Sequence, residues 1–304
     1  MSNGQWYPPE WPDRIRALAA GELAVAEPRR AATVLLLRGA GRTVEVHMLR
    51  RRSSMAFAGG AYAYPGGGVD PRDEHPVRWA GPGPAEWAER LGVATPAEAQ
   101  AIVCAAVRET YEEAGVLLAG PTPDSVVGDT TGDDWEAARV ALVARELSFA
   151  EFLASRDLVL RSDLLGAWAR WITPEFEPRR YDTWFFVAAL PAGQRTLTQA
   201  PDTAPAGGTP AASSEADLSV WIRPADAAAG YDRGELLMMP PTIATLRTLT
   251  AYDSPLAALE AARDRDLAPV LARAGLDGDR VVLSWPGHDE FTKHVPGAPS
   301  GGAA

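Results

Sequence analysis

The sequence predicts a layered domain of helices and β-sheet, of the α+β or α/β/α class. Three observations support this fold class. Residues 31–38 and 43–50 are apolar segments joined by a turn at Gly39–Gly41, a pattern typical of a β-hairpin. Residues 96–114 are mostly good helix formers. Further strands and helices follow without strict βαβ alternation, which favours a layered domain over a purely parallel βαβ fold.

The helix over residues 96–114 has clear signals at both ends. Thr95 is a suitable N-cap, Pro96 suits the first helical position, and Glu98 completes a capping box with Thr95. Gly115 follows the last helical residue, where glycine commonly ends a helix. We therefore expect a helix with well-defined limits.

The remaining elements are expected in the following places. Strands are predicted at 166–172, 182–190, 217–222 and 280–285, and helices at 85–91, 134–147, 149–155, 224–229, 241–252 and 255–264. Residues 199–216 form a low-complexity loop, and the tail from Pro296 is expected to be disordered. We expect an N-terminal extension over 1–29, a main domain over 30–252 with a surface insertion at 74–95, and a C-terminal segment over 253–304.

Composition limits the classes of function. The chain has 304 residues, 46% of them hydrophobic, and a net charge of −11, which is ordinary for a globular protein but unsuited to general nucleic-acid binding. Its only lysine is Lys293, so nearly all positive charge comes from arginine. A small anionic substrate remains compatible with this charge if a metal ion and a few arginines gather at one site.

Cysteine usage and hydropathy bear on the compartment. Cys104 is the only cysteine, which excludes an intrachain disulfide, favours a reducing compartment, and is expected to be a buried apolar-like residue. No apolar segment approaches the length of a membrane span, and the first residues do not resemble a signal peptide. We therefore expect a cytoplasmic protein without membrane or nucleic-acid partners.

The end of the 96–114 helix carries an unusual group of charges. Glu109, Glu112 and Glu113 are spaced i, i+3 and i+4, so they share one helical face. They repel one another and lie near the negative end of the helix dipole, and each such contact costs about 0.3–1 kcal/mol. A bound cation would reverse the sign of these terms, and hard cations such as Mg²⁺ prefer carboxylate oxygens. A solvated acidic face with ordinary ion pairs is the alternative explanation.

The surrounding residues favour the cation site. The segment 108–116 resembles the core of the Nudix box, R-E-U-x-E-E-x-G-U, where U is a bulky apolar residue. Six positions match: Arg108, Glu109, Glu112, Glu113, Gly115 and Val116. Thr110 departs from the pattern at the first apolar position. The resemblance implies a Nudix-type α/β/α sandwich with a mixed sheet.

The first half of the box has a counterpart upstream. Tyr64-Pro65-Gly66-Gly67 resembles the aromatic-Pro-Gly-Gly that opens the box, and Asp73 stands six residues after Gly67, where the family has a glutamate. However, 34 residues (74–107) separate this half from Arg108, far more than the family usually has, which predicts an insertion before the catalytic helix. Because loop closure entropy grows slowly with length, the two halves can still meet. Glu74 and Glu98 remain alternatives to Asp73.

Later segments resemble one branch of the family. They are Trp171–Pro174, Arg179–Phe186, Glu215 before the strand ending at Val220-Trp221, and Met239–Thr242. The branch is that of the peroxisomal coenzyme A diphosphatases, which also have an insertion in the box. The resemblance covers roughly residues 30–250. Homodimers are common in the family, so a homodimer is an expectation by analogy.

The resemblance implies a metal-dependent hydrolase that cleaves a diphosphate bond in a nucleotide-type small molecule. Glu109, Glu112 and Glu113 would bind Mg²⁺ or Mn²⁺, helped by a backbone carbonyl at Gly66 or Gly67. Arg108 lies at i−4 from Glu112 and is expected to hold a carboxylate in place. The general base is expected to be Glu109, Glu112 or Glu215, with a preference for Glu109.

Several residues are candidates for binding the substrate. Arg50, Arg51 and Arg52 precede the glycine loop, and Arg179 and Arg180 precede a predicted strand; these arginines are candidates for phosphate contacts. Among them, Arg50, Arg52 and Arg180 are assigned to the substrate site. Tyr64, with Tyr62 and Trp184, is an aromatic candidate for the pocket, although aromatic residues on strands are more often core. Gly66 and Gly67 allow close approach of the backbone.

Two classes of function remain open from the sequence. In the first, the protein is a diphosphatase, with coenzyme A or an acyl-CoA as the expected substrate and ADP-ribose or NADH as the alternative. In the second, it is a Nudix-fold module that senses a nucleotide without cleaving it. The complete glutamate triad argues against the second class, as does the absence of a basic helix-turn-helix segment.

Overall fold

The computed structural model describes residues 10–52, 59–197, 216–277 and 280–285. Glu215, nearly all of the predicted 199–216 loop and the tail from Pro296 lie outside these residues. Among the helices within them, none is long and apolar enough to cross a membrane.

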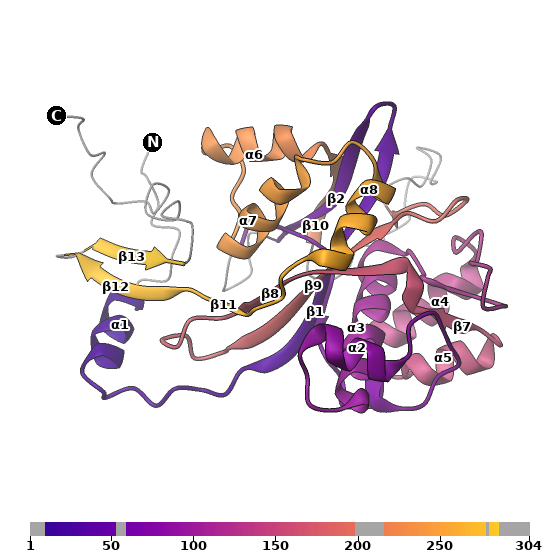
Figure 1. The fold of residues 1–304 in the computed structure, drawn as a ribbon, viewed down its shortest axis with the longest axis horizontal. Coiled ribbons are helices and arrows are strands. Elements are labelled where there is room, and N and C mark those ends of the chain that lie inside the picture. Colours follow the sequence, from indigo (N-terminus) through magenta and orange to yellow (C-terminus); the bar gives the residue numbers. More distant parts are fainter. Residues whose placement is uncertain (1–9, 53–58, 198–215, 278–279, 286–304) are drawn as a thin grey trace.

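The central element is a mixed eight-stranded sheet (Figure 1). Its main path runs β10-β2-β1-β9-β8-β11, while β3 pairs with β2 and β4 pairs with β1. The β1–β9 and β8–β11 pairs are parallel and the others are antiparallel. The strands are β1 (Arg29–Ala40), β2 (Thr43–Arg51), β3 (Tyr62–Ala63), β4 (Gly66–Gly68), β8 (Leu165–Ile172), β9 (Tyr181–Ala189), β10 (Ala216–Ile222) and β11 (Val270–Leu271).

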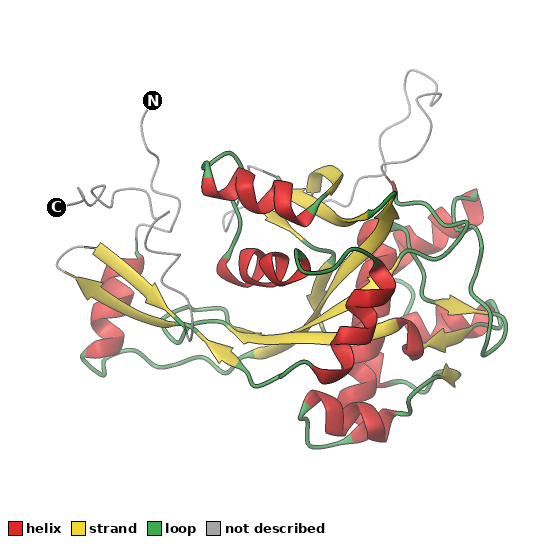
Figure 2. Cartoon of the chain, turned by 45° about the horizontal axis from the view of Figure 1, so that its top comes forward, coloured by secondary structure: helices red, strands yellow, loops and turns green. Residues whose placement is uncertain are grey.

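Helices cover both faces of this sheet, as Figures 1 and 2 show. Alternate residues of β1 point to opposite faces, with Val34 and Leu36 in one hydrophobic cluster and Leu35 and Leu37 in the other. The first cluster includes residues of α2 (Pro84–Leu91), α3 (Pro96–Ala114), α4 (Asp133–Val143) and α5 (Phe149–Ser155), and the second includes residues of α6 (Pro224–Asp232), α7 (Pro240–Leu249) and α8 (Pro255–Ala261). This arrangement confirms the predicted α/β/α sandwich with a mixed sheet.

The segment between the glycine loop and α3 is folded onto the domain. It contains a 3₁₀ turn, η1 (Pro71–Glu74), a short strand, β5 (Trp79–Ala80), and α2. The strand β5 joins β7 (Val159–Arg161) and β6 (Ala119–Gly120) in a small second sheet. Trp87 and Leu91 of α2 are buried in the first cluster. One face of the predicted surface insertion is therefore part of the core.

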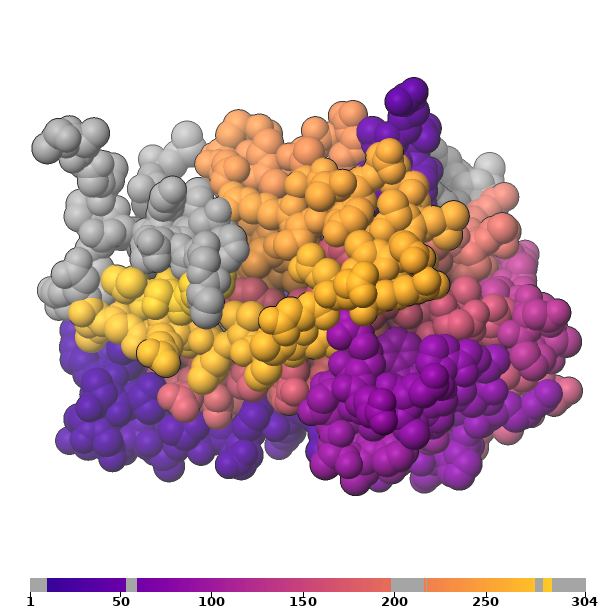
Figure 3. Space-filling view, in the orientation of Figure 1, coloured from indigo at the N-terminus to yellow at the C-terminus, as the bar shows by residue number. Residues whose placement is uncertain are grey.

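The two ends of the described chain pack together. Helix α1 (Trp11–Ala19) places Trp11 and Ile15 in the second cluster with residues of the hairpin β12 (Arg273–Asp277) and β13 (Arg280–Ser284). Figure 3 shows the indigo N-terminal segment and the yellow hairpin on the same side of the molecule. The sequence predicts neither α1 nor β12. Strand β11 belongs to the main sheet, so the C-terminal segment continues the domain.

Candidate active site

The catalytic helix predicted from the sequence is α3, and both of its ends form as expected. Thr95 accepts a hydrogen bond from the Glu98 amide, and the Glu98 side chain accepts one from the Thr95 amide. Gly115 ends the helix with a φ of 73°, a left-handed conformation that favours glycine. Glu109, Glu112 and Glu113 therefore lie in the last turns of α3, beside its C-terminus.

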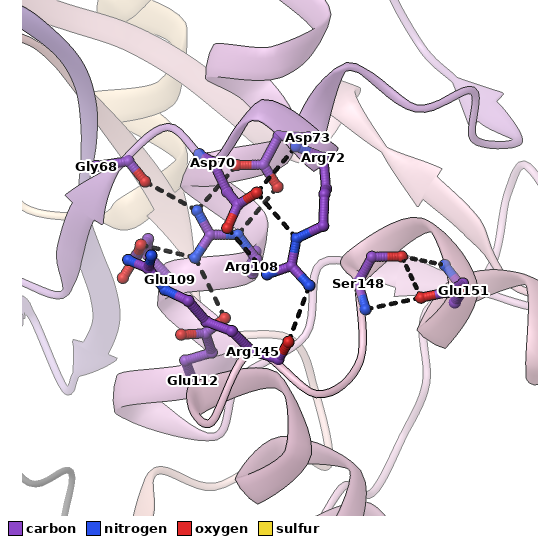
Figure 4. A network of polar contacts seen from close by, with 10 residues as sticks. All are labelled: Gly68, Asp70, Arg72, Asp73, Arg108, Glu109, Glu112, Arg145, Ser148 and Glu151. Carbon is purple, nitrogen blue, oxygen red and sulfur yellow. Dashed lines mark hydrogen bonds and ion pairs between the residues drawn. The ribbon is translucent and has the colours of Figure 1, made fainter.

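Arg108 is the centre of the site (Figure 4). Its side chain is only 10% exposed. Its Nε and Nη2 donate to the two carboxylate oxygens of Asp73, at 3.0 and 2.9 Å. Nη1 donates to Glu109 at 2.7 Å and to Glu112 at 3.2 Å, and Nη2 also donates to the Gly68 carbonyl at 2.9 Å. All five guanidinium hydrogens are therefore engaged, and arginine alone among side chains offers this fork.

Of the three acidic candidates from the first half of the motif, Asp73, Glu74 and Glu98, only Asp73 contacts Arg108. Its side chain is 1% exposed, and besides binding Arg108 it accepts a hydrogen bond from the Asp70 amide at 2.9 Å. Glu98 pairs instead with Arg30 and with the N-terminus of α3, whereas Glu74 is exposed. The insertion therefore leaves the two halves of the motif in contact, with Asp73 orienting Arg108.

The turn that presents Asp73 is itself stabilised by charge. Asp70 caps η1 by accepting from the Arg72 amide and also binds the Arg72 guanidinium. The hydrogen bonds from Arg72 lower the pKa of Asp70 to about 2, against a smaller effect of burial. Arg72 also donates to the carbonyl of Arg145, which ties this turn to the α4–α5 connection.

The glycine loop forms β4 and lies directly against the glutamates. The Gly66 amide donates to a carboxylate oxygen of Glu113 at 2.9 Å. A Cβ atom on Gly67 would lie 2.5 Å from one carboxylate oxygen of Glu109 and 2.6 Å from the other, so only glycine leaves room for this side chain. The glycines and the acidic end of α3, far apart in sequence, thus form one site.

The electrostatics of the glutamates are governed by burial. Desolvation raises the pKa of Glu109 to about 7, while the charge of Arg108 opposes the shift and that of Glu112 adds to it. Burial also raises the pKa of Glu112, again against Arg108. A divalent cation bound here would favour the ionised form of both groups.

The carboxylate oxygens of Glu109, Glu112 and Glu113 are the kind of donor that a hard cation prefers. Carboxylate oxygens of Glu109 and Glu112 lie within 3.2 Å of the same nitrogen of Arg108. Glu109 and Glu113 adjoin the glycine loop. Within the described residues no three acidic, histidine or cysteine side chains are already arranged as a metal-ligand group. Arg108 holds the carboxylates of Glu109 and Glu112, and the Gly66 amide holds that of Glu113. A bound cation would draw these oxygens toward itself.

The last turn of α3 is also held from the side of α4. Arg139, which is 4% exposed, donates to the backbone carbonyl of Glu112 at 2.7 Å and forms a two-point ion pair with Glu136. Neither Arg139 nor Arg72 is predicted from the sequence as a site residue. Their only sequence signal is arginine beside an acidic residue, which is common on solvated surfaces.

A cavity of about 250 Å³ opens beside Glu113. Its walls come from the glycine loop, from strands of the main sheet and from the start of α7; the lining residues are Thr33, Leu49, Arg51, Ala63, Tyr64, Gly66, Glu113, Thr183, Phe185, Ala216, Met239, Pro241 and Thr242. Arg51 is the only arginine among these lining residues, and within the described part of the chain its buried Nε atom has no hydrogen-bond partner. The cavity thus combines two charged residues, Glu113 and Arg51, with an apolar wall, as in many ligand sites.

The predicted substrate-binding residues divide into two groups. Tyr64, Gly66 and Arg51 line the cavity, and the Tyr64 hydroxyl donates to the Thr242 carbonyl at 3.0 Å. Arg50 and Arg52 do not line it, because side chains alternate along β2. Arg180 lies in a second cavity, where it donates to the carbonyls of Thr173 and Ala26.

The remaining candidates take structural positions. Trp184 is 1% exposed and packs in the first cluster, and its indole N–H donates to the Leu91 carbonyl. Cys104 is buried in the same cluster, as expected. His47 is fully buried and forms a 2.6 Å hydrogen bond with Ser219.

The fold and this site define the class. A layered α/β/α domain that brings a Pro-Gly-Gly loop against an R-E-x-x-E-E helix is that of a Nudix hydrolase. The sequence matches the NUDT19 Nudix domain family over residues 83–249, more than half of the chain, and the chain belongs to this family. The match begins within the insertion, after the glycine loop.

Two relatives make the assignment more specific. The chain is 28% identical over 274 residues to the acyl-coenzyme A diphosphatase NUDT19 of Gallus gallus, an alignment that covers 74% of this chain and 69% of that protein. The crystal structure of a Nudix hydrolase from Alicyclobacillus acidocaldarius superposes with a TM-score of 0.61 at 27% identity, covering 78% of this chain and 97% of the other. The protein is therefore a NUDT19-type Nudix hydrolase.

Proposed function

We propose that this enzyme hydrolyses the diphosphate linkage of coenzyme A or an acyl-CoA and releases two phosphomonoesters. The single observation that carries the proposal is the cavity at Glu113, which Arg51 and several apolar side chains also line. The similarity to an acyl-coenzyme A diphosphatase supports this choice of substrate.

Glu109, Glu112 and Glu113 would hold Mg²⁺ or Mn²⁺, with the Gly67 carbonyl as a further oxygen donor. A divalent metal bound there supplies charge neutralisation for the diphosphate and lowers the pKa of a coordinated water. Arg108 keeps Glu109 and Glu112 oriented, and Asp73 keeps Arg108 oriented. Phosphoryl transfer requires mainly positioning and charge stabilisation, which this arrangement provides.

The other residues take separate roles. Arg51, which lines the cavity, would bind a phosphate oxygen through its guanidinium group. Leu49, Phe185 and Met239 form the apolar part of the wall, which suits the less polar portion of the substrate. The general base is Glu109, Glu112 or Glu215, and we favour Glu109 because Gly67 and Arg108 hold its position from two sides.

The proposal is tested with a substrate panel and one variant. Coenzyme A, acyl-CoAs, ADP-ribose, NADH and dinucleoside polyphosphates would be incubated with Mg²⁺ or Mn²⁺ and the monophosphate products measured. Coenzyme A or an acyl-CoA should have the highest kcat/KM. Glu113→Gln should reduce turnover by roughly a hundredfold or more without unfolding the protein, and Glu89→Gln, on the exposed side of α2, should have no effect.

Three outcomes would contradict the proposal. Preferred hydrolysis of ADP-ribose or NADH would reassign the substrate. Tight binding of one compound with hydrolysis of none would indicate a nucleotide sensor. Full activity of Glu113→Gln would remove the metal site from the mechanism.

A further inference from the structure

A second cavity, of about 160 Å³, lies near the first and is rich in arginine. Its lining residues are Ala26, Glu27, Arg29, Pro178, Arg179, Arg180 and Tyr181. Three arginines and one glutamate line this cavity, an excess of positive charge in a chain whose net charge is −11. Within the described chain, neither Arg29 nor Arg179 forms an ion pair or a side-chain hydrogen bond.

Hydrogen bonds fix the backbone and the Arg180 side chain at this cavity. Arg180 is only 7% exposed and donates to two backbone carbonyls, Thr173 at 3.0 Å and Ala26 at 2.8 Å. The Arg29 amide donates to the Arg180 carbonyl at 2.9 Å, which joins the start of β1 to the start of β9. The positions of Arg29 and Arg179 at the rim are therefore set by ordered backbone.

The two cavities lie along the same face of the sheet. Tyr181 lines the second cavity and Thr183 lines the first, and residues two apart on a strand share a face about 7 Å apart. On the paired strand, Arg29 lines the second cavity and Thr33 the first, about 13 Å away. The residue between them, Ala31, is small, so one extended molecule can contact both.

We propose that the Arg29–Arg179–Arg180 cavity binds a phosphomonoester that the substrate carries apart from its diphosphate. A guanidinium group can donate two parallel hydrogen bonds to phosphate oxygens. Within the described residues none of the three arginines forms an ion pair with a carboxylate, and Arg180 donates only to backbone carbonyls. Coenzyme A contains such a group, the 3′-phosphate on its ribose. This inference rests on the proposed function, because it assumes that the diphosphate occupies the Glu113 end.

The test compares coenzyme A with 3′-dephospho-coenzyme A, which differ only in this phosphate. The wild-type enzyme should have a lower KM for coenzyme A, and Arg179→Ala should raise that KM by roughly tenfold or more with kcat retained. The same substitution should not change the KM for the dephospho compound. Glu27→Gln, which removes the negative charge from the cavity, should lower the KM for coenzyme A.

The controls separate this site from general effects. Arg42→Ala removes an exposed arginine at the far end of β1 and should change neither KM. Arg180 is not substituted, because its two carbonyl contacts hold the fold. Equal KM values for the two compounds in the wild type, or equal effects of Arg179→Ala on both, would overturn the inference.

A binding measurement distinguishes failure of this inference from failure of the proposed function. If neither compound is hydrolysed, the proposed function fails, and calorimetry with adenosine 3′,5′-bisphosphate and with AMP then tests the cavity directly. Tighter binding of the bisphosphate that is lost in Arg179→Ala supports the site. Equal binding of the two nucleotides, or titration of inorganic phosphate that is unchanged by Arg179→Ala, overturns it.

Discussion

Gly67 and Gly68 are adjacent residues with opposite tolerance for a side chain. A Cβ on Gly67 would lie 2.5 Å from a Glu109 oxygen, whereas a Cβ on Gly68 would meet nothing within 4 Å. Gly67→Ala should therefore displace Glu109 and reduce turnover by roughly a hundredfold, with little change in the free energy of unfolding. Gly68→Ala should keep activity, since its carbonyl still accepts from Arg108. Similar kinetics for the two variants would contradict this account of the loop.

Asp73 and Glu74 provide a second matched pair of neighbours. Asp73→Asn removes the charge from a buried two-point ion pair, whereas Glu74 is exposed. Because Arg108 retains Glu109 and Glu112, we expect a loss of up to about 3 kcal/mol in unfolding free energy and reduced turnover. Glu74→Gln should behave as wild type in urea denaturation and in kinetics. A stable, fully active Asp73→Asn protein would show that Arg108 needs no orienting partner.

Site residues could be predicted where the spacing within one helix determines their positions. Where the position depends on how strands pair, the sequence indicates only a group of candidates. The i, i+3, i+4 spacing places Glu109, Glu112 and Glu113 together at the end of a helix, as the structure shows. The phosphate-contact candidates Arg50, Arg51 and Arg52 are equivalent in the sequence. Whether residue 51 faces the cavity depends on the register in which β2 pairs with its neighbouring strands. That register is set by tertiary contacts and is not visible in the local sequence.

At the scale of elements, the best predictions were those with terminal signals. The Thr95 capping box and Gly115 set the limits of α3 as predicted. A second capping box, Ser148 with Glu151, begins α5 at Phe149, where a helix is predicted. Strands of two or three residues, such as β5 and β6, have no periodicity to detect. They form because the insertion packs against β7, which is a long-range contact.

The insertion should contribute to global stability. Trp87 on α2 is 5% exposed and its ring lies 5.9 Å from that of Phe186 on the central sheet. Trp87→Ala should lower the free energy of unfolding by about 3–5 kcal/mol, because it leaves a large cavity in the first hydrophobic cluster. Glu89→Ala, on the exposed face of the same helix, should change it by less than about 0.5 kcal/mol. Equal urea midpoints for the two variants would mean that α2 is only peripheral.

At the scale of the molecule, the two ends of the described chain complete one core. Trp11 of α1 packs edge-on against Phe176 at a centroid distance of 4.9 Å, and Trp171 packs against Trp285 at 5.7 Å. These pairs join segments that are more than 100 residues apart. No local sequence pattern indicates these aromatic pairs. The packing of the N-terminal segment in the second hydrophobic cluster therefore could not be predicted from the sequence.

Whole-molecule stability should also fall in mild acid, through His47. This histidine is fully buried on β2, opposite Trp221 of the paired strand β10. The centroids of the two rings are 5.1 Å apart, and the charge of Arg38 also acts on the imidazole. Burial, with a smaller effect of Arg38, lowers its pKa from 6.5 to about 4. In the unfolded chain the ordinary value returns, so the unfolded state binds more protons between these two pH values. Stability contributed by neutral His47 is therefore present above pH 6.5 and is lost as the pH falls toward 4.

The size of this effect follows from the shift, and His47→Gln isolates it. A shift from 6.5 to about 4 corresponds to a loss on the order of 3 kcal/mol by the lower end of the window. Glutamine can still bond to Ser219 but does not titrate, so its urea midpoint should fall less steeply between pH 7 and pH 4. Carboxylates contribute equally to both proteins and cancel in the comparison. Parallel loss of stability in the two proteins would mean that His47 accepts a proton in the folded state, against the burial that surrounds it.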